Sequence, residues 1–155
     1  VGLGDLHARG FDYVALGHIH KHQQVGSVPP AVYAGSPERI DFGEEREAKG
    51  FVSLTISDDG PGARRTEWEF HELPARPFKT LTIDARIDDP MVTVRRELER
   101  SARDVVGAIV RAQIEVEPGR ERNVNTQEVR RMLLEAGASF VAHVIVTSDT
   151  IGRSR

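Results

Sequence analysis

The chain has 155 residues, of which 39% are hydrophobic and 29% charged, and its formal net charge is −3; this composition is typical of one folded domain or two small ones. It has no cysteine, which excludes disulfides and thiolate metal sites and indicates a reducing compartment such as the bacterial cytoplasm. No apolar stretch approaches the roughly 20 residues that span a bilayer, and the acidic net charge differs from that of a strongly basic nucleic-acid-binding protein.

Residues 11–16 form an apolar run that favours a β-strand, and the run ends at Gly17-His18-Ile19-His20. If the extended backbone continues through this motif, His18 and His20 point to the same side, as alternate residues of a strand do. Two neighbouring imidazoles can bind a borderline metal ion such as zinc, manganese or iron. The alternative interpretation is a pair of hydrogen-bonded surface histidines.

The rest of the first half is predicted to be strands joined by turns. A loop that contains Pro29-Pro30 leads to an extended piece at residues 32–34. Residues 50–56 and 66–71 alternate apolar and polar side chains on either side of a cluster of turn residues, which predicts a β-hairpin. His71 shares the polar face of the second strand with two glutamates, and we interpret that face as solvated rather than metal-binding.

Residues 73–78 contain two prolines that interrupt the pattern, so we place a boundary there. The second half then predicts a β-α-β-α-β unit with its helices on one side of a sheet. His143 lies in the last of these strands and is interpreted as a structural histidine. The predicted elements are a strand at residues 79–85, a helix from Asp89-Pro90, a strand at residues 110–116, a helix capped at Asn125 and ended by Gly137, and a strand at residues 140–147.

Three segments follow Gly17-His18-Ile19-His20 in a fixed order: Tyr33-Ala34-Gly35-Ser36-Pro37-Glu38-Arg39, Phe42-Gly43-Glu44-Glu45 and Lys49-Gly50-Phe51-Val52. This ordered series resembles the calcineurin-like metallophosphoesterases. Within them it is most similar to the SbcD-type DNA-repair exonucleases, the nuclease subunit of the SbcCD complex. Gly-His-x-His alone points to the superfamily, and the segment at residues 33–39 narrows the resemblance to this subfamily. The similarity covers about residues 11–80, and it is looser beyond them.

The resemblance implies an α+β fold: the C-terminal part of a metallophosphoesterase β-sandwich domain over residues 1–74, then a small cap domain over residues 75–155. It implies two divalent metal ions, usually manganese, with His18 and His20 as one ligand each. It also implies DNA as the substrate and an SbcC-type coiled-coil ATPase subunit as the partner. The full-length protein would be a homodimer within a heterotetramer. The turn at residues 35–37 would shape the wall near the metals, unless it is only a tight turn.

The family's other ligand motifs, including Asp-x-His and Gly-Asn-His, are not found at their expected places in this sequence. Asp5-Leu6-His7 reads as Asp-x-His but lies too close to His18 in the sequence, so we assign Asp5 and His7 to a connecting loop or helix end. Two ligands do not hold a metal pair, because catalytic sites usually take about three protein ligands for one ion. We therefore expect these residues to be the C-terminal portion of a longer enzyme, with catalytic residues upstream and negligible activity in this portion alone.

Two other functions remain open on the sequence. The first is another calcineurin-like phosphoesterase, acting on phosphoproteins or cyclic nucleotides. The second is a non-catalytic DNA-binding or assembly module. A DNA-binding face is one interpretation of Arg95, Arg96, Arg100 and Arg103 on the first helix of the second half; the other is a solvated face interspersed with Glu97 and Glu99.

Overall fold

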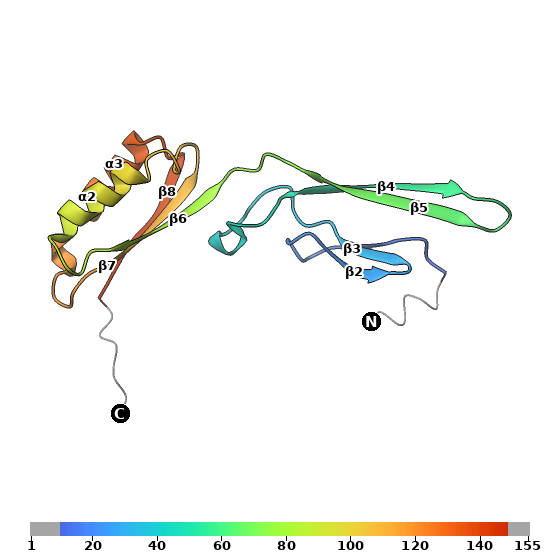
Figure 1. The fold of residues 1–155 in the computed structure, drawn as a ribbon, viewed down its shortest axis with the longest axis horizontal. Helices are drawn as coiled ribbons and strands as arrows, with labels where there is room; N and C mark the ends of the chain where they lie inside the picture. Colours follow the sequence, from blue (N-terminus) through green and yellow to red (C-terminus); the bar gives the residue numbers. More distant parts are fainter. Residues whose placement is uncertain (1–9, 149–155) are drawn as a thin grey trace, which may run out of the picture. The chain divides into compact units, whose positions relative to one another are not determined.

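The computed structural model of the protein describes residues 10–148 and has the α+β fold that the sequence predicts. The described residues form eight strands in three sheets and two α-helices (Figure 1). The chain divides into two compact units, Val1–Ala75 (unit 1) and Arg76–Arg155 (unit 2). The sequence places this boundary after residue 74, one residue earlier.

Unit 1 begins with a three-stranded sheet in the order β1-β3-β2. Strand β1 (Val14–Leu16) pairs in parallel with β3 (Pro30–Tyr33), and β2 (Gln23–Ser27) pairs antiparallel with β3. Strand β2 was not predicted from the sequence. Because β1 contains three residues only, the extended backbone stops before the Gly17-His18-Ile19-His20 motif.

The second part of unit 1 is the predicted hairpin of β4 (Gly50–Asp58) and β5 (Arg64–Glu72). Leu54 lies opposite Trp68, so apolar side chains gather on one face of the hairpin. The His22 ring stacks on Phe70 with centroids 4.0 Å apart and planes inclined by 12°. The segment between β1 and β2 therefore packs against this apolar face through an aromatic contact.

Unit 2 is a parallel sheet in the order β6-β7-β8, with both helices on one face (Figure 1). A helical crossover joins β6 to β7 and another joins β7 to β8, as parallel pairing requires. The predicted elements are all present, with bounds that differ by a few residues or less. They are β6 (Phe78–Asp84), α2 (Pro90–Arg100), β7 (Ile109–Glu115), α3 (Thr126–Glu135) and β8 (Phe140–Thr147).

The ends of both helices follow the predicted signals. The Asp89 carboxylate accepts from the backbone N–H groups of Met91 and Val92, at 3.0 and 3.1 Å, and Pro90 occupies the first turn. The Asn125 side chain accepts from the N–H of Glu128 at 3.1 Å. These bonds satisfy N–H groups that have no partner within the helix. The Glu128 carboxylate pairs with Arg95 at 2.7 Å, which links α3 to α2.

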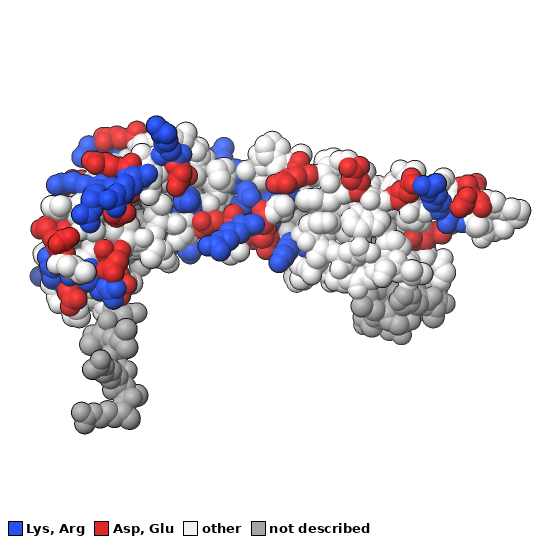
Figure 2. Space-filling view, viewed as in Figure 1, with Lys and Arg blue, Asp and Glu red and all other residues white. Residues whose placement is uncertain are grey.

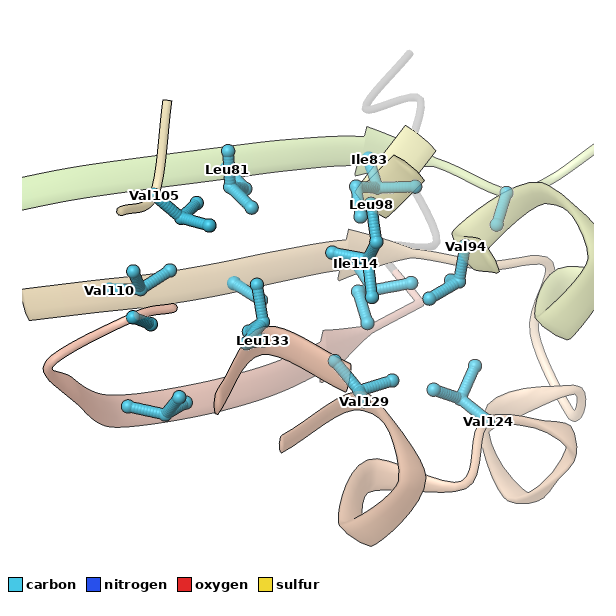
Figure 3. Close-up of a cluster of buried hydrophobic side chains, with 14 of the residues drawn as sticks. Leu81, Ile83, Val94, Leu98, Val105, Val110, Ile114, Val124, Val129 and Leu133 are labelled. Carbon is cyan, nitrogen blue, oxygen red and sulfur yellow. The ribbon is translucent and has the colours of Figure 1, made fainter. Parts of the chain in front are cut away.

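The buried apolar cluster of the described residues lies in unit 2, between the sheet and its two helices (Figure 3). The cluster includes Val110 and Ile114 of β7, Val94 of α2, and Val129 and Leu133 of α3, and all five are at most 1% exposed. In unit 1, the described apolar residues that are buried are Ala31 and Val32. Unit 2 thus has a core of its own, whereas unit 1 is held mainly by strand pairing and polar contacts. No helix among residues 10–148 has the length and apolar character needed to cross a bilayer.

Charged side chains of both signs are intermingled on the face of unit 2 that Figure 2 shows. Three of the four arginines proposed for a basic face pair with glutamates: Arg95 with Glu128, and both Arg96 and Arg100 with Glu97. These pairs favour the interpretation of a solvated face interspersed with glutamates. They reduce the local positive charge that phosphate binding needs.

Candidate metal centre

The motif that follows β1 has a bent backbone. His18 lies at a bend and has a φ of 80°, a left-handed conformation that is uncommon for a residue other than glycine, although histidine adopts it more often than most. The alternation argument from the sequence therefore does not apply, since the strand ends at Leu16. His18 is exposed, and its left-handed backbone conformation costs of order 1–3 kcal/mol. Such strain is commonly found at functional positions.

The ring of His20 is fixed by a buried carboxylate. Its Nδ1 lies 2.8 Å from Oε1 of Glu44, and the imidazole is partly open to solvent, with 39% of its side-chain area exposed. Glu44 is placed by the short helical turn η1 (Phe42–Glu44), whose start is capped by the Asp41 carboxylate accepting from the N–H of Gly43 at 2.7 Å. One ring nitrogen of His20 is thus occupied within the protein, and the other is left for an outside partner.

Glu44 is in turn held by Lys49, whose side chain is fully buried. The Lys49 ammonium lies 2.6 Å from Oε2 of Glu44 and 3.0 Å from Oε2 of Glu47, and it donates to the backbone carbonyl of His20 at 3.1 Å. These three acceptors match its three N–H donors. A buried charge is tolerated when it is paired and hydrogen-bonded in this way.

The pKa values of this pair are set by opposing causes. Burial alone would raise the pKa of the Glu44 carboxyl, but hydrogen bonds from Lys49 and His20 hold it below its usual value. Burial alone would lower the pKa of the Lys49 ammonium, but hydrogen bonds to Glu44 and Glu47 raise it. Both groups are therefore charged at neutral pH, and each makes the burial of the other tolerable.

The predicted turn at residues 35–37 lies directly against the backbone of His20. The N–H of Ser36 donates to the carbonyl of His20 at 3.2 Å, and Gly35 has a φ of 86°. A Cβ atom at position 35 would lie 2.9 Å from the carbonyl oxygen of His20 and 3.0 Å from the nitrogen of His22. Glycine is required here because this approach leaves no room for a side chain. This segment therefore holds the backbone of His20, and its role in shaping a wall near metal ions stays a prediction.

Arg39 fixes the loop that carries Glu44. Its guanidinium donates to the backbone carbonyls of Glu44, Glu47 and Ala75, at 3.1, 2.7 and 3.3 Å. The planar, five-donor side chain suits such a multiple contact. Arg39 therefore holds the backbone around Glu44 in place.

The remaining histidines have other surroundings. The Nδ1 of His22 donates to the carbonyl of Tyr33 at 3.0 Å, and its ring stacks on Phe70, so it has a packing role. His71 contacts the Ser53 hydroxyl at 2.7 Å on the polar face of the hairpin, and His143 is exposed on β8. Asp5 and His7 lie outside the described residues.

The described part of the chain contains no group of three or more His, Cys, Asp or Glu side chains arranged to hold a metal ion. His20 nevertheless fits a ligand, because metal-binding histidines usually donate their second ring nitrogen to a carboxylate or carbonyl. Imidazole nitrogen also suits manganese, zinc and iron. The residues present therefore fit part of a metal site, and further ligands would have to come from outside residues 10–148. A scan against protein-family models finds no match to this chain.

Glu44 and Lys49 are the residues of the site that sequence reasoning missed. Both stand in segments that carry the resemblance, Phe42-Gly43-Glu44-Glu45 and Lys49-Gly50-Phe51-Val52, but no role was assigned to them. No local pattern signals the burial of Lys49, because it depends on contacts with the distant His20 and with Glu44. The backbone of Lys49 lies beside the end of β5, where the N–H of Leu73 donates to its carbonyl at 2.7 Å.

Proposed function

We propose that this chain contributes two metal ligands, His18 and His20, to the di-metal centre of a manganese-dependent DNA nuclease of the SbcD type, acting in double-strand break repair in the bacterial cytoplasm. The observation that carries the proposal is the His20–Glu44–Lys49 network, which immobilises one imidazole and leaves its second nitrogen for a ligand. The left-handed backbone of His18, two residues earlier, supports it. The resemblance of the ordered motifs to SbcD-type enzymes supports the choice of a nuclease.

When bound, the two metal ions would supply Lewis-acid chemistry for phosphodiester hydrolysis, by polarising the phosphoryl group and lowering the pKa of a bound water. This chain's residues would bind and orient. His18 and His20 offer imidazole nitrogen, Glu44 holds the ring of His20, and Gly35 and Ser36 hold its backbone. The remaining ligands are expected outside the described residues, and we expect the 155 residues alone to have negligible nuclease activity.

The β-α-β-α-β arrangement of unit 2 supports its proposed role as the cap that helps to hold DNA. The ion pairs on α2 argue against a broad basic patch there. We therefore expect DNA contacts from the cap to be few and local. An SbcC-type ATPase partner and a homodimer within a heterotetramer are part of the same proposal.

The test is cleavage of end-labelled linear duplex DNA by the full-length protein with Mn²⁺, with and without a chelator. His18→Ala and His20→Ala should each abolish cleavage, whereas His143→Ala should not, because His143 is exposed on β8 of unit 2. Small phosphodiesters and phosphoproteins, assayed in parallel, test the other phosphoesterase function. Turnover of those substrates with intact DNA would contradict the nuclease proposal.

A non-catalytic DNA-binding or assembly module is the second candidate, and one observation favours it: fewer than three ligand side chains converge within residues 10–148. It predicts that the full-length protein binds duplex DNA without metal-dependent cleavage. Chelator-insensitive DNA binding with no product would favour this module over the nuclease.

A further inference from the structure

We propose that Glu44 is a positioning residue for His20, with Lys49 as its anchor: the carboxylate selects the imidazole tautomer that carries its proton on Nδ1, so that the lone pair on Nε2 would be available to a metal ion. The inference rests on the proposed role of His20 as a ligand. It adds two residues, Glu44 and Lys49, that act on the metal only through His20.

The tautomer follows from the chemistry of the contact. The ionised Glu44 carboxylate can only accept hydrogen bonds, so the Nδ1 of His20, 2.8 Å away, must be the donor. A neutral imidazole carries one proton, and if this proton is on Nδ1 then Nε2 has a free lone pair. Nitrogen with a free lone pair is the form of histidine that binds metal ions.

The position of the carboxylate is fixed from three sides. Its Oε2 accepts from the Lys49 ammonium at 2.6 Å and from the backbone N–H of Ile40 at 3.3 Å, while Oε1 contacts the ring. Lys49 also donates to the backbone carbonyl of His20. One buried cation therefore constrains both the ring and the main chain of the same histidine, which leaves Nε2 little freedom to move. Such a pre-set donor avoids the entropy of ordering the ring when a ligand binds.

The first test reads the tautomer directly and needs no variant. Long-range ¹H–¹⁵N NMR of the metal-free full-length protein at pH 8, where an ordinary imidazole is neutral, should show the proton of His20 on Nδ1. His20 contacts Oε1 of Glu44 and Lys49 contacts Oε2. In Glu44→Gln one of these oxygens becomes an NH2 donor, and with the amide oxygen kept by Lys49 this donor faces Nδ1, so the Nε2-protonated form should appear. A wild-type His20 that is protonated on Nε2 would overturn the inference.

The second test measures Mn²⁺ affinity by isothermal titration calorimetry. Glu44→Gln should weaken binding by about 10- to 100-fold, the usual effect of losing such an outer partner. Glu47→Gln is the matched control, since Glu47 contacts the same Lys49 but not the ring. It should change affinity by less than about threefold. The ¹H–¹⁵N NMR signals of unit 1 report whether each variant is folded there.

The outcomes separate this inference from the proposed function. Loss of Mn²⁺ binding in His20→Ala together with unchanged binding in folded Glu44→Gln would overturn the role of Glu44 and keep His20 as a ligand. Equal losses in Glu44→Gln and Glu47→Gln would also overturn it, because the effect would then be general. Unchanged binding in His20→Ala would remove the proposed function itself, and the positioning role with it.

Discussion

Lys49 donates a hydrogen bond to the backbone carbonyl of His20 over 3.1 Å, although 29 residues separate them in the chain. In a unit with few buried apolar side chains, this contact and the two glutamates around the ammonium join the loop before β4 to the segment after β1. The candidate site and the fold of unit 1 therefore depend on the same group.

Lys49→Met should destabilise unit 1 by about 3–5 kcal/mol, because it leaves the Glu44 and Glu47 carboxylates without their buried counter-ion. Trp68 is the only tryptophan of these 155 residues and lies in unit 1, so its fluorescence during denaturant unfolding of this chain reports that unit. Both described α-helices belong to unit 2, so the circular dichroism at 222 nm reports mainly unit 2. The Trp68 transition should move and the 222 nm transition should not. Lys21→Met, at an exposed lysine of the same unit, should cost less than about 0.5 kcal/mol; equal effects of the two changes would contradict the role of Lys49.

Gly35→Ala should damage unit 1 more than Gly62→Ala. Both glycines have positive φ, 86° and 76°, so each alanine incurs the left-handed strain of about 1–2 kcal/mol. Only at Gly35 does the new Cβ also meet backbone atoms, those of His20 and His22, whereas nothing lies within 4 Å at Gly62. Trp68-monitored unfolding should show the larger loss for Gly35→Ala, and Mn²⁺ affinity should fall in that variant alone. Equal unfolding losses would show that the close approach at Gly35 is unimportant.

The elements of unit 2 were predictable because local signals and tertiary packing agree there. The alternation of Val110, Ala112 and Ile114 marks one buried face of β7, and the residues at Asn125 and Gly137 mark the ends of α3. When the apolar pattern, the helix-capping residues and the buried core all indicate the same element, that element can be predicted from the sequence.

The site was only partly predictable. His18 and His20 were found from their spacing, and their role as ligands stays a prediction. The reason given for it, a continued strand, was wrong, because His18 turns the chain with a positive φ. Strand β2 was missed since Gln23–Ser27 has little of the β-branched or aromatic character that marks strands. The burial of Glu44 and Lys49 depends on contacts between distant segments, and residue type alone argues against burying either.

Leu133→Ala should destabilise unit 2 by about 2–5 kcal/mol, the usual cost of a cavity in a packed core. Leu133 is 1% exposed between α3 and the sheet, whereas its neighbour Leu134 is 48% exposed. Leu134→Ala is therefore the matched control and should cost less than about 1 kcal/mol. The 222 nm transition in urea reads both changes, and a similar shift for the two leucines would place the core elsewhere.

Asp84 gives a pH-dependent contribution to the stability of unit 2. Hydrogen bonds from the Arg86 guanidinium, at 2.8 and 2.5 Å, lower the pKa of its carboxyl from 3.8 to about 2. Since the folded pKa is the lower one, the contribution is complete above pH 3.8 and is lost as the pH falls through about 2. Arg86→Ala should return the pKa of Asp84 towards 3.8, as followed by ¹³C NMR of the carboxyl group. An unchanged Asp84 titration in that variant would exclude Arg86 as the cause.

The most direct test of the central claim is metal analysis of the purified full-length protein, by plasma mass spectrometry after equilibration with Mn²⁺. The account predicts that His18→Ala and His20→Ala each lower the bound metal per chain, while His143→Ala leaves it at the wild-type value. Wild-type metal content in both His18→Ala and His20→Ala would contradict the assignment of this motif as a metal site.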